Sequence, residues 1–395
     1  MPLKILYHHR TQGRGAEGLH ISGIVESFRE MGHEVVVVSP PGIDPLMPKA
    51  VSSSDGPARS SGPLTAGWKW VAHHLPGFMF ELAEMIYNVP SYFRLRRILA
   101  RGKFDLVYER YAFFLLSGMV LARQFDVPFV LEANEVNGIE MRTRRQFFPR
   151  LCSRFERRLF AGCDAIHTVS SYLKQRIVES GIPAKRVFVA PNAFDIRAIE
   201  GSARSQSLVQ KFGLAGKQVI GFAGWFSDWD RLDFLIDVVH GLKPAHPRIA
   251  LLLIGDGPMV PRLREQVEQL GLAGNVIFSG PVPRSQVYEH IALLDVAVLP
   301  HSNRFGSPVV MFEFMGLKIP VVAPRLEPIM DVQEDGRTAL LFDPLDKAQC
   351  LGAISNMLSD PPMGRRLASA AYNKLVGEHT WMRNAENALT SVGLR

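Results

Sequence analysis

Short apolar runs alternate along the chain with longer segments whose apolar residues recur at helical spacing. Apolar runs of this length between turn residues are typical of buried parallel strands. Such strands are predicted at 4–9, 105–111, 128–134, 296–299 and 320–323. Helices are predicted within 25–40, 113–124 and 217–239. This alternation predicts an α/β fold of parallel strands joined by crossover helices.

One predicted helix, Val309 to Gly316, has no polar face. Ser307 and Pro308 are predicted to be its N-cap and first helical residue, since serine accepts an unpaired helix N–H and proline lacks one. Glu313 is the one acid of this helix, so its carboxylate should be buried. A buried carboxylate needs a partner. The partner is either a ligand or, in a purely structural interpretation, a backbone N–H or an arginine.

The start of the same helix is a second candidate binding element. Its unpaired N–H groups and its dipole favour an anion. An anion at the helix start and hydroxyl groups at Glu313 together describe a nucleotide diphosphate.

Polar side chains follow two neighbouring predicted strands in the first half of the chain. Glu109 and Arg110 end one strand, and Glu132, Asn134 and Glu135 end or follow the next. The carboxyl ends of strands form the ligand crevice of a doubly wound sheet, which favours a binding or catalytic role. The structural alternative is that the acids form ion pairs with nearby arginines.

A glycine-rich loop at 10–18 carries Gly13, Gly15 and Gly18 in the G-x-G-x-x-G pattern. A dinucleotide site would need a tight turn directly after the strand and an acid at the end of the second strand. Three residues intervene here, and the second strand ends without an acid. The loop therefore gives little support to a dinucleotide-dependent oxidoreductase or epimerase. A merely flexible loop is a further alternative.

Length and charge narrow the class of protein. The 395 residues suit two ordinary domains. No apolar stretch approaches the roughly 18 residues that span a bilayer, and the N-terminus does not resemble a signal peptide. The three cysteines lack metal-ligand spacing and are compatible with a reducing cytoplasm. The net charge of +7 falls entirely in residues 1–200, which suggests an anionic partner for that half.

Two stretches of the first half combine aromatic and basic residues, 67–103 and 142–160. They are separated from the first strands by a loop rich in proline, serine and glycine at 45–66, expected to be mobile. A helical face of this composition could lie on an anionic membrane. The structural alternative is that the aromatic residues fill the core. No nucleic-acid-binding motif accompanies the arginines, so nucleic acid is not an expected partner.

The segments SPVVMFEFMG (307–316) and KIPVVAP (318–324) resemble the nucleotide-sugar signature of the retaining glycosyltransferases of family four. The resemblance covers essentially the whole chain and is strongest over 163–195 and 217–346. It implies a GT-B fold of two Rossmann-like doubly wound domains facing across a cleft. The expected parts are 1–195 on the acceptor side, 196–373 for the nucleotide sugar, and a helix at 374–395 that crosses back. The implied activity is sugar transfer with retention to a glycan or lipid-linked acceptor in bacterial polysaccharide synthesis.

The resemblance also implies roles for individual residues. Glu313 would hold the ribose hydroxyls, and the segment at Pro281 and Val282 would contact the base. Further substrate contacts are expected at Arg14, Gly15, Glu109, Arg110, Gly224, Trp225, Arg304, Phe305, Gly306, Ser307, Pro308 and Val309. The catalytic candidates are Glu132, Asn134, Glu135 and Arg231. No Asp-x-Asp motif is present, so neither a metal nor a cofactor beyond the nucleotide sugar is expected.

The chain departs from the family where the diphosphate is usually held. Trp225, Asp230 and Val310 stand at positions that are usually cationic or serine, and Phe305 replaces a frequent glutamate. Arg231 is the first candidate to supply the missing charge, ahead of Arg304 and Arg14. These departures leave open a GT-B-like subunit that binds nucleotide or glycan without catalysis. The expected location is the cytoplasm, with the inner face of the cell membrane as a candidate surface.

Overall fold

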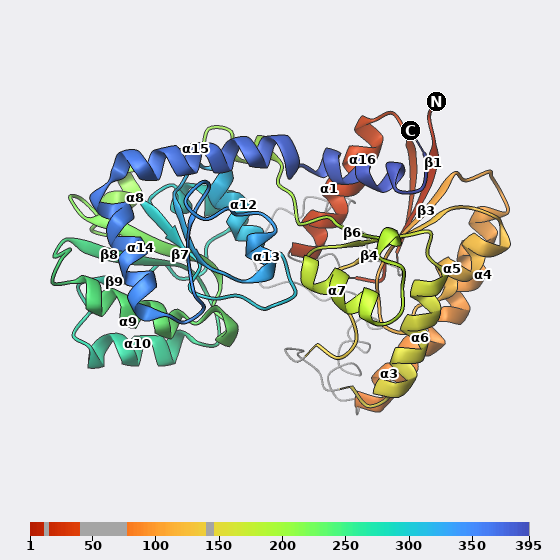
Figure 1. Cartoon of the computed structure of the whole chain (residues 1–395), viewed down its shortest axis with the longest axis horizontal. Coiled ribbons are helices and arrows are strands. Elements are labelled where there is room, and N and C mark those ends of the chain that lie inside the picture. Colours follow the sequence, from red (N-terminus) through yellow and green to blue (C-terminus); the bar gives the residue numbers. More distant parts are fainter. Residues whose placement is uncertain (12–15, 40–76, 140–145, 395) are drawn as a thin grey trace, which may run out of the picture. The chain divides into compact units, whose positions relative to one another are not determined.

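The computed structural model describes residues 1–11, 16–39, 77–139 and 146–394, and Figure 1 shows the course of the chain. It divides into two compact units. The first unit comprises 1–169, 173–190 and the chain from Asn384, and the second comprises 170–172 and 191–383. The boundaries predicted from the sequence lay after residues 195 and 373. The predicted mobile loop at 45–66 lies outside the described residues, as do Gly13 and the two predicted contacts Arg14 and Gly15.

The first unit is a sheet of six parallel strands in the order β2-β1-β3-β4-β5-β6. Its strands are β1 (Lys4–His8), β2 (Glu34–Val38), β3 (Leu106–Arg110), β4 (Phe129–Ala133), β5 (Ala165–Thr168) and β6 (Val187–Val189). Its helices are α1 (Ala16–Glu30), α3 (Gly77–Ile86), α4 (Asn88–Leu99), α5 (Ser117–Gln124), α6 (Pro149–Gly162) and α7 (Ser171–Glu179).

The second unit has six parallel strands in the order β12-β11-β10-β7-β8-β9. They are β7 (Gln218–Trp225), β8 (Ile249–Asp256), β9 (Val276–Phe278), β10 (Val296–Val298), β11 (Val321–Pro324) and β12 (Leu340–Phe342). The helices are α8 (Gln206–Lys211), α9 (Leu232–Leu242), α10 (Val260–Gln269), α11 (Val287–Ile291), α12 (Val309–Gly316), α13 (Glu327–Met330), α14 (Lys347–Ser359), α15 (Pro361–Glu378) and α16 (Trp381–Thr390). Most of α16 is grouped with the first unit, where Ser391 Oγ lies 3.1 Å from His167 Nε2.

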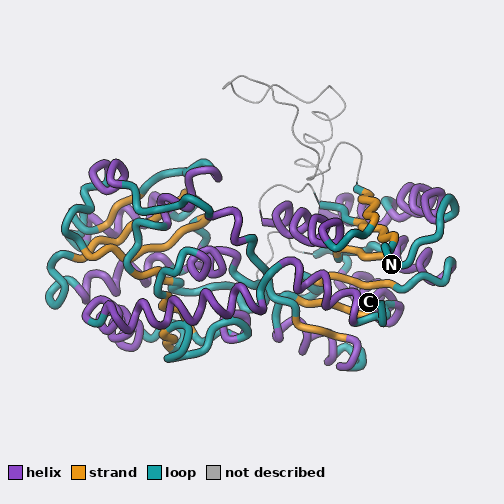
Figure 2. Tube along the Cα trace, turned by 90° about the horizontal axis from the view of Figure 1, so that it is seen from above, coloured by secondary structure: helices purple, strands orange, loops and turns teal. Residues whose placement is uncertain are grey.

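In both units helices enclose the strands, as the orange strands and purple helices of Figure 2 show. The prediction of an α/β fold with two doubly wound parallel sheets is therefore confirmed. Strand order reverses between β1 and β3 in one sheet and between β7 and β10 in the other. Ligands of such sheets bind beyond the strand carboxyl ends near these points. None of the described helices is long and apolar enough to cross a membrane.

The helix predicted at 113–124 begins later, at Ser117. Phe114 has a φ of 60°, which a continuous α-helix does not accommodate. The Asn88 side chain then accepts the N–H groups of Leu116 and Ser117, at 2.8 and 3.2 Å. A side chain from another helix thus determines where α5 starts, and the local apolar pattern does not reveal this.

The pairing of β7 with β8 requires glycine at its carboxyl end. Gly224 lies in register with Gly255, and a Cβ atom on Gly255 would lie 2.0 Å from the carbonyl oxygen of Gly224. Gly255 also has a φ of 131°, which residues with a side chain rarely adopt. The two long strands can approach each other here only because Gly255 lacks a side chain.

Gly255→Ala should therefore destabilise the second unit by about 1–3 kcal/mol or more, because backbone strain and the clash add. Urea unfolding followed by tryptophan fluorescence measures the change. Gly274→Ala is the control, since a Cβ there meets no atom within 4 Å. Equal stability of the two variants would contradict this account of the strand pair.

Candidate functional site

Glu313 lies buried in α12 of the second unit, as predicted, and contacts an arginine. Its side chain is 5% exposed, and its Oε1 lies 2.7 Å from an Arg284 guanidinium nitrogen. Burial raises the pKa of the Glu313 carboxyl, and the charge and hydrogen bond of Arg284 oppose that rise. Arg284 is itself half exposed and also donates to the Tyr288 hydroxyl at 2.6 Å. The arginine of the structural interpretation is thus present, on a side chain that solvent reaches.

The loop before α12 differs from the sequence prediction at its cap. The helix starts at Val309 with Pro308 as its cap residue, in an extended conformation, and no side chain caps it. The prediction of Ser307 as N-cap and Pro308 as first helical residue is wrong. The Ser307 hydroxyl instead accepts the N–H of Asn192 at 3.2 Å, and the Asn192 side chain donates to the Ser307 carbonyl at 2.7 Å. The Ser307 hydroxyl thus binds the segment at Asn192, which precedes it by 115 residues in the chain.

Two further side chains shape this loop. Asn303 Oδ1 accepts the N–H groups of Phe305 and Gly306, at 3.2 and 2.5 Å. The Ser170 hydroxyl donates to the carbonyl of Phe305 at 2.6 Å. The predicted contacts Phe305, Gly306 and Ser307 thus lie together in a turn whose backbone is held from both sides.

Two arginines lie near this loop and affect the same histidine. Arg231 and Arg304 both lower the pKa of His301, although burial contributes more to the decrease. Arg231 adopts a left-handed conformation, and its guanidinium bonds both carboxylate oxygens of Asp233 at 3.0 Å. Arg304 is exposed, and no ion pair to it is found in the described part of the chain. Arg231 thus already has a carboxylate partner, whereas no ion-pair partner of Arg304 is found among the described residues.

The other predicted contacts of the second unit are spread around the edge of the sheet. Trp225 ends β7, and its side chain is 66% exposed. Pro281 is exposed, whereas Val282 is partly buried against the core. Both residues lie just before Arg284 in the chain. The same segment therefore positions the arginine that pairs with Glu313.

A separate polar cluster in the first unit surrounds Glu132, at the end of β4. The carboxylate accepts hydrogen bonds from Arg110, from Asn134 Nδ2 at 2.6 Å and from the Tyr108 hydroxyl at 3.1 Å. His20 Nδ1, on α1, lies 3.2 Å from its second oxygen. The structure thus brings together three predicted residues, Glu132, Asn134 and Arg110, from two neighbouring strands.

Charge in this cluster is concentrated on Glu132 and Arg110. Burial lowers the pKa of His20 to about 4, so the imidazole is neutral near pH 7. Burial alone would raise the pKa of Glu132, but His20, Arg110 and the hydrogen bonds of the cluster lower it below its usual value. We attribute the lowering mainly to Arg110 and the hydrogen bonds, because a neutral His20 carries no charge. The carboxylate is therefore ionised and holds a fixed negative charge.

Glu109 and Glu135 occupy different surroundings from Glu132. Glu109 is completely buried, with its Oε2 2.5 Å from His8 Nδ1, at the point where strand order reverses. A Cβ on Gly118 would lie 2.0 Å from the same carboxylate, so α5 covers it closely. Glu135 is partly exposed in the loop after β4. The structure thus encloses Glu109 and leaves Glu135 accessible.

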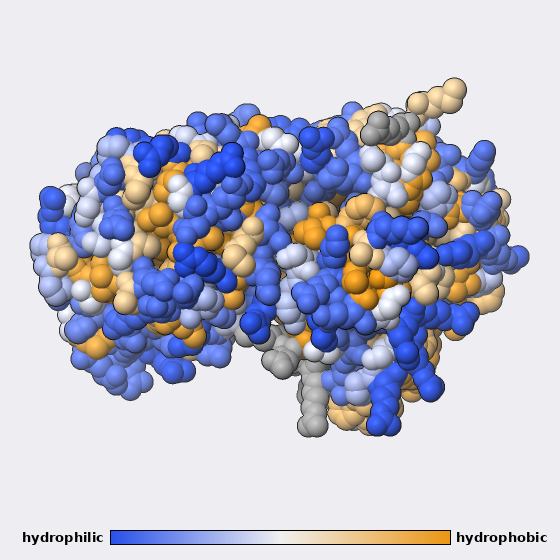
Figure 3. All heavy atoms as spheres, viewed as in Figure 1, coloured by the Kyte–Doolittle hydropathy of each residue, from blue (hydrophilic) through white to orange (hydrophobic). Residues whose placement is uncertain are grey.

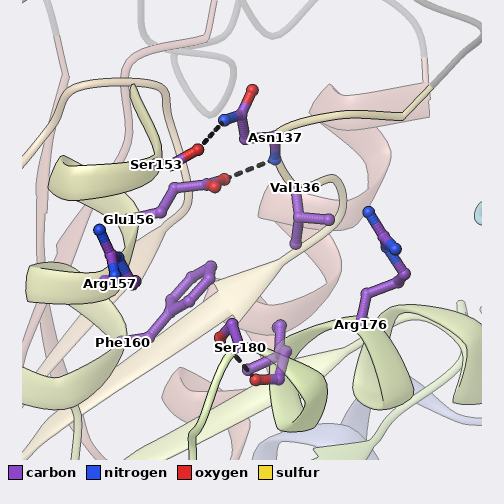
Figure 4. Close-up of a pocket in the computed structure, with 9 residues that line it drawn as sticks. Val136, Asn137, Ser153, Glu156, Arg157, Phe160, Arg176 and Ser180 are labelled. Atoms are coloured by element: carbon purple, nitrogen blue, oxygen red, sulfur yellow. Dashed lines mark hydrogen bonds between the residues drawn. The ribbon is translucent and has the colours of Figure 1, made fainter. Parts of the chain in front are cut away.

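The first unit also contains a pocket of about 170 Å³ between α6, α7 and the loop after β4 (Figure 4). Asn137 donates through its side chain to Ser153 at 2.7 Å and through its N–H to Glu156 at 2.6 Å. Arg157 and Arg176 lie on either side of it. No predicted site residue lines this pocket, whose acid is already bonded.

Three residues that shape these sites were absent from the sequence prediction, His20, Arg284 and Asn303. His20 lies two residues after the glycine-rich loop 10–18, which is a usable signal, but histidine is common in cores. Arg284 begins a short 3-10 helix and Asn303 lies in a loop, and neither has a distinguishing sequence pattern. Among the described residues, no group of three or more His, Cys, Asp or Glu side chains could hold a metal ion.

Asp230 provides a pH test of the second unit. Burial raises the pKa of its carboxyl to about 7. The folded pKa then exceeds the unfolded value of about 3.9, so stability falls as pH rises between these values. Asp230→Asn should be more stable than the wild type at pH 8, by at most about 4 kcal/mol, and equally stable at pH 4. Urea unfolding at both pH values measures this, with the exposed Asp228→Asn as control. A pH-independent difference would contradict it.

The chain is similar in sequence to two families of glycosyltransferases and to several of their members. The model of "Glycosyltransferase Family 4" matches residues 18–198, and that of "Glycosyl transferases group 1" matches 205–374. The D-inositol 3-phosphate glycosyltransferase of Stackebrandtia nassauensis is 25% identical over 370 residues, which cover 88% of this chain and 82% of the relative. The GDP-mannose-dependent alpha-(1-6)-phosphatidylinositol monomannoside mannosyltransferase of Mycolicibacterium smegmatis is also 25% identical, over 57% of this chain and 61% of its own length.

Solved structures share the fold. Anabaena HepE, crystallised with UDP, matches with a TM-score of 0.72 at 20% identity, over 98% of this chain and all of that one. Sucrose-phosphate synthase from Thermosynechococcus elongatus matches with a TM-score of 0.70 at 16% identity, over 97% of both chains. These similarities confirm the two-domain α/β GT-B fold. Since the two family models together match nearly all of residues 18–374, the chain belongs to the family 4 and group 1 glycosyltransferases.

Proposed function

We propose that the protein transfers a sugar from a nucleotide-diphosphate sugar to a glycan or lipid-linked acceptor, with retention, in bacterial glycoconjugate synthesis. The observation that carries the proposal is the buried Glu313 whose ion-pair partner, Arg284, is half exposed. Because the Arg284 guanidinium already contacts water, the pair is weak and the side chain can move away without a large change in its own solvation. This pair therefore leaves a carboxylate that a ligand can reach by displacing one flexible side chain.

The nucleotide would be bound by three parts of the second unit. The Glu313 carboxylate can accept the two ribose hydroxyls. The turn at 281–284 would lie against the base, and Arg284 would turn from the carboxylate toward the nucleotide. The first N–H groups of α12 have no intrahelical partner and suit the diphosphate.

The cation for the diphosphate is proposed to be Arg304 ahead of Arg231, which reverses the order favoured by the sequence. Arg231 already bonds both oxygens of Asp233. Moving it to a phosphate would leave that carboxylate without its partner. Arg304 needs no such exchange, and it directly precedes the loop held by Asn303. In a retaining transfer these groups would stabilise the departing diphosphate. Independence of metal remains part of the proposal.

The first unit would supply the acceptor side through the cluster around Glu132. A fixed carboxylate beside Asn134 and Arg110 can hold sugar hydroxyls or stabilise positive charge that develops on the transferred sugar. The Tyr7 hydroxyl is buried nearby, and among the described residues no hydrogen-bond partner to it is found. Burial raises its pKa well above the usual range, so it stays a neutral hydrogen-bond donor.

A non-catalytic binding subunit is the second candidate. The observation that favours it is the partly buried acid Asp230 and the exposed Trp225, at positions where the family usually has groups that bind phosphate. A charged Asp230 would repel a diphosphate. Binding and turnover measured on the same preparation distinguish the two candidates.

The first measurement is calorimetric titration with UDP, GDP, ADP and NAD. One nucleoside diphosphate should bind, and Glu313→Gln should weaken it at least about tenfold, because two hydrogen bonds to a charged group are lost. Arg304→Ala should weaken it more than Arg231→Ala. The exposed Glu289→Gln serves as the matched control. Absence of binding to the wild type would overturn the donor site, and preference for NAD would favour an oxidoreductase.

Turnover with the sugar donor so identified tests the first unit. Glu132→Gln should lower kcat at least about tenfold while leaving the affinity for the nucleotide unchanged, because the carboxylate belongs to the acceptor side. Circular dichroism must show that the variant is folded, since Arg110 loses its charged partner. Glu26→Gln, an exposed acid of α1, is the control. A folded Glu132→Gln variant with normal kcat would assign Glu132 a structural role.

A further inference from the structure

Two consecutive helices of the first unit present apolar side chains to solvent. On α3, Phe78, Leu82 and Ile86 follow one another at intervals of four residues, which places them on one helix face. Val89 and Phe93 have the same spacing on α4, and Phe93 is 62% exposed. A run of exposed apolar side chains is unusual on a monomeric protein and marks an interaction surface.

A second segment, 147–151, continues this surface. Phe147, Phe148 and Leu151 are all exposed, and the ring of Phe147 meets that of Phe78 edge-on at 6.2 Å. Buried Glu81 accepts the N–H groups of Phe147 and Phe148, at 2.8 and 2.9 Å. The two phenylalanines are therefore held on α3 with their rings outward, so their exposure is a built feature of the fold.

The charge around these apolar residues is positive. Residues 77–103 contain five basic and two acidic residues, and 146–162 contain four arginines and one acid. All three acids have partners: Glu81 bonds backbone N–H groups, Glu84 bonds Arg10 at 2.6 Å, and Glu156 bonds Tyr111. Arg94 donates to the carbonyl of Ser39, whereas the arginines of α6 are exposed. Arg150, Arg154 and Arg157 follow one face of α6 and line an open depression of about 500 Å³ together with Leu151.

We propose that α3, α4 and residues 147–157, named here the aromatic–basic surface, dock on an anionic lipid bilayer. Apolar side chains beside arginines match the two layers of a membrane interface, acyl chains below and anionic headgroups above. A nucleic acid would use the arginines but not the aliphatic residues Leu82, Ile86 and Val89. Figure 3 shows pale orange apolar atoms beside deep blue hydrophilic ones at the lower end of the first unit, where Figure 1 places α3 and α6.

The aromatic–basic surface bears on two expectations from the sequence, the burial of the aromatic residues and the contact with a membrane. For residues 67–103 the sequence slightly favoured aromatic residues that fill the core, but Phe78 and Phe93 are exposed, and Phe80 and Tyr92 are only partly buried. Trp68 and Trp70 lie outside the described residues. A membrane contact in the first unit would bring a lipid-linked acceptor to the enzyme, a consequence that rests on the proposed function. The docking itself does not depend on it.

Sedimentation of the full chain with vesicles tests the inference without any activity. Vesicles of phosphatidylcholine with phosphatidylglycerol should bind the protein, and vesicles of phosphatidylcholine alone should bind it at least about tenfold less. Raising the salt from about 0.1 M to about 1 M should weaken binding, since screening shortens the Debye length from about 10 to about 3 Å.

Two triple variants divide the surface into its parts. Phe78→Ser with Leu82→Ser and Phe93→Ser removes the apolar contact, and Arg150→Ala with Arg154→Ala and Arg157→Ala removes charge. Each should reduce binding to the anionic vesicles at least about tenfold. Arg262→Ala with Arg365→Ala and Arg366→Ala, an equal loss of charge from exposed sites of the second unit, should leave binding unchanged.

Circular dichroism checks the fold of each variant. Absence of vesicle binding by the wild type, or normal binding by both folded surface variants, would overturn the proposal. Self-association that the apolar variant abolishes, without vesicle binding, would overturn it in favour of a second copy of this chain.

Discussion

Burying a carboxylate in a protein costs several kcal/mol unless donors compensate for the lost water. Among its described residues this protein buries Glu81, Glu109, Glu132, Glu156 and Glu313, and their hydrogen-bond partners differ. Glu81 bonds two backbone N–H groups and joins α3 to the start of α6. Glu109 is enclosed with His8 at the centre of the first sheet. Glu156 accepts the Tyr111 hydroxyl and the N–H of Asn137. These three acids have a structural role.

The remaining two buried acids are the ones that chemistry can use. Glu132 is surrounded by donors from two strands and a helix, and its pKa lies below its usual value although burial alone would raise it. Its charge is therefore fixed in position before any ligand arrives. Glu313 has a raised pKa and a half-exposed arginine. A ligand with hydroxyl groups can replace that arginine, because its hydroxyls donate to the carboxylate while the half-exposed guanidinium returns to water.

On the surface of the first unit, acids and arginines also differ in whether they have partners. Its acids there are bonded to backbone, arginine or tyrosine, whereas the arginines of α6 are left to solvent. The positive balance of residues 1–200 is thus concentrated where apolar side chains are also exposed. Neither feature alone would indicate a partner, but together they select an anionic and apolar one.

The sequence by itself determined the strand and helix order, the apolar helix Val309–Gly316 and the burial of Glu313, because these follow from local apolar periodicity. The grouping of Arg110, Glu132 and Asn134 also followed, since carboxyl ends of parallel strands share one edge. Only the tertiary structure decided which groups pair. Arg284 with Glu313, Asn192 with Ser307 and Asn88 with the start of α5 are contacts between distant segments. The exposure of the phenylalanines was decided in the same way, because an amphipathic pattern does not tell which face a neighbouring helix covers.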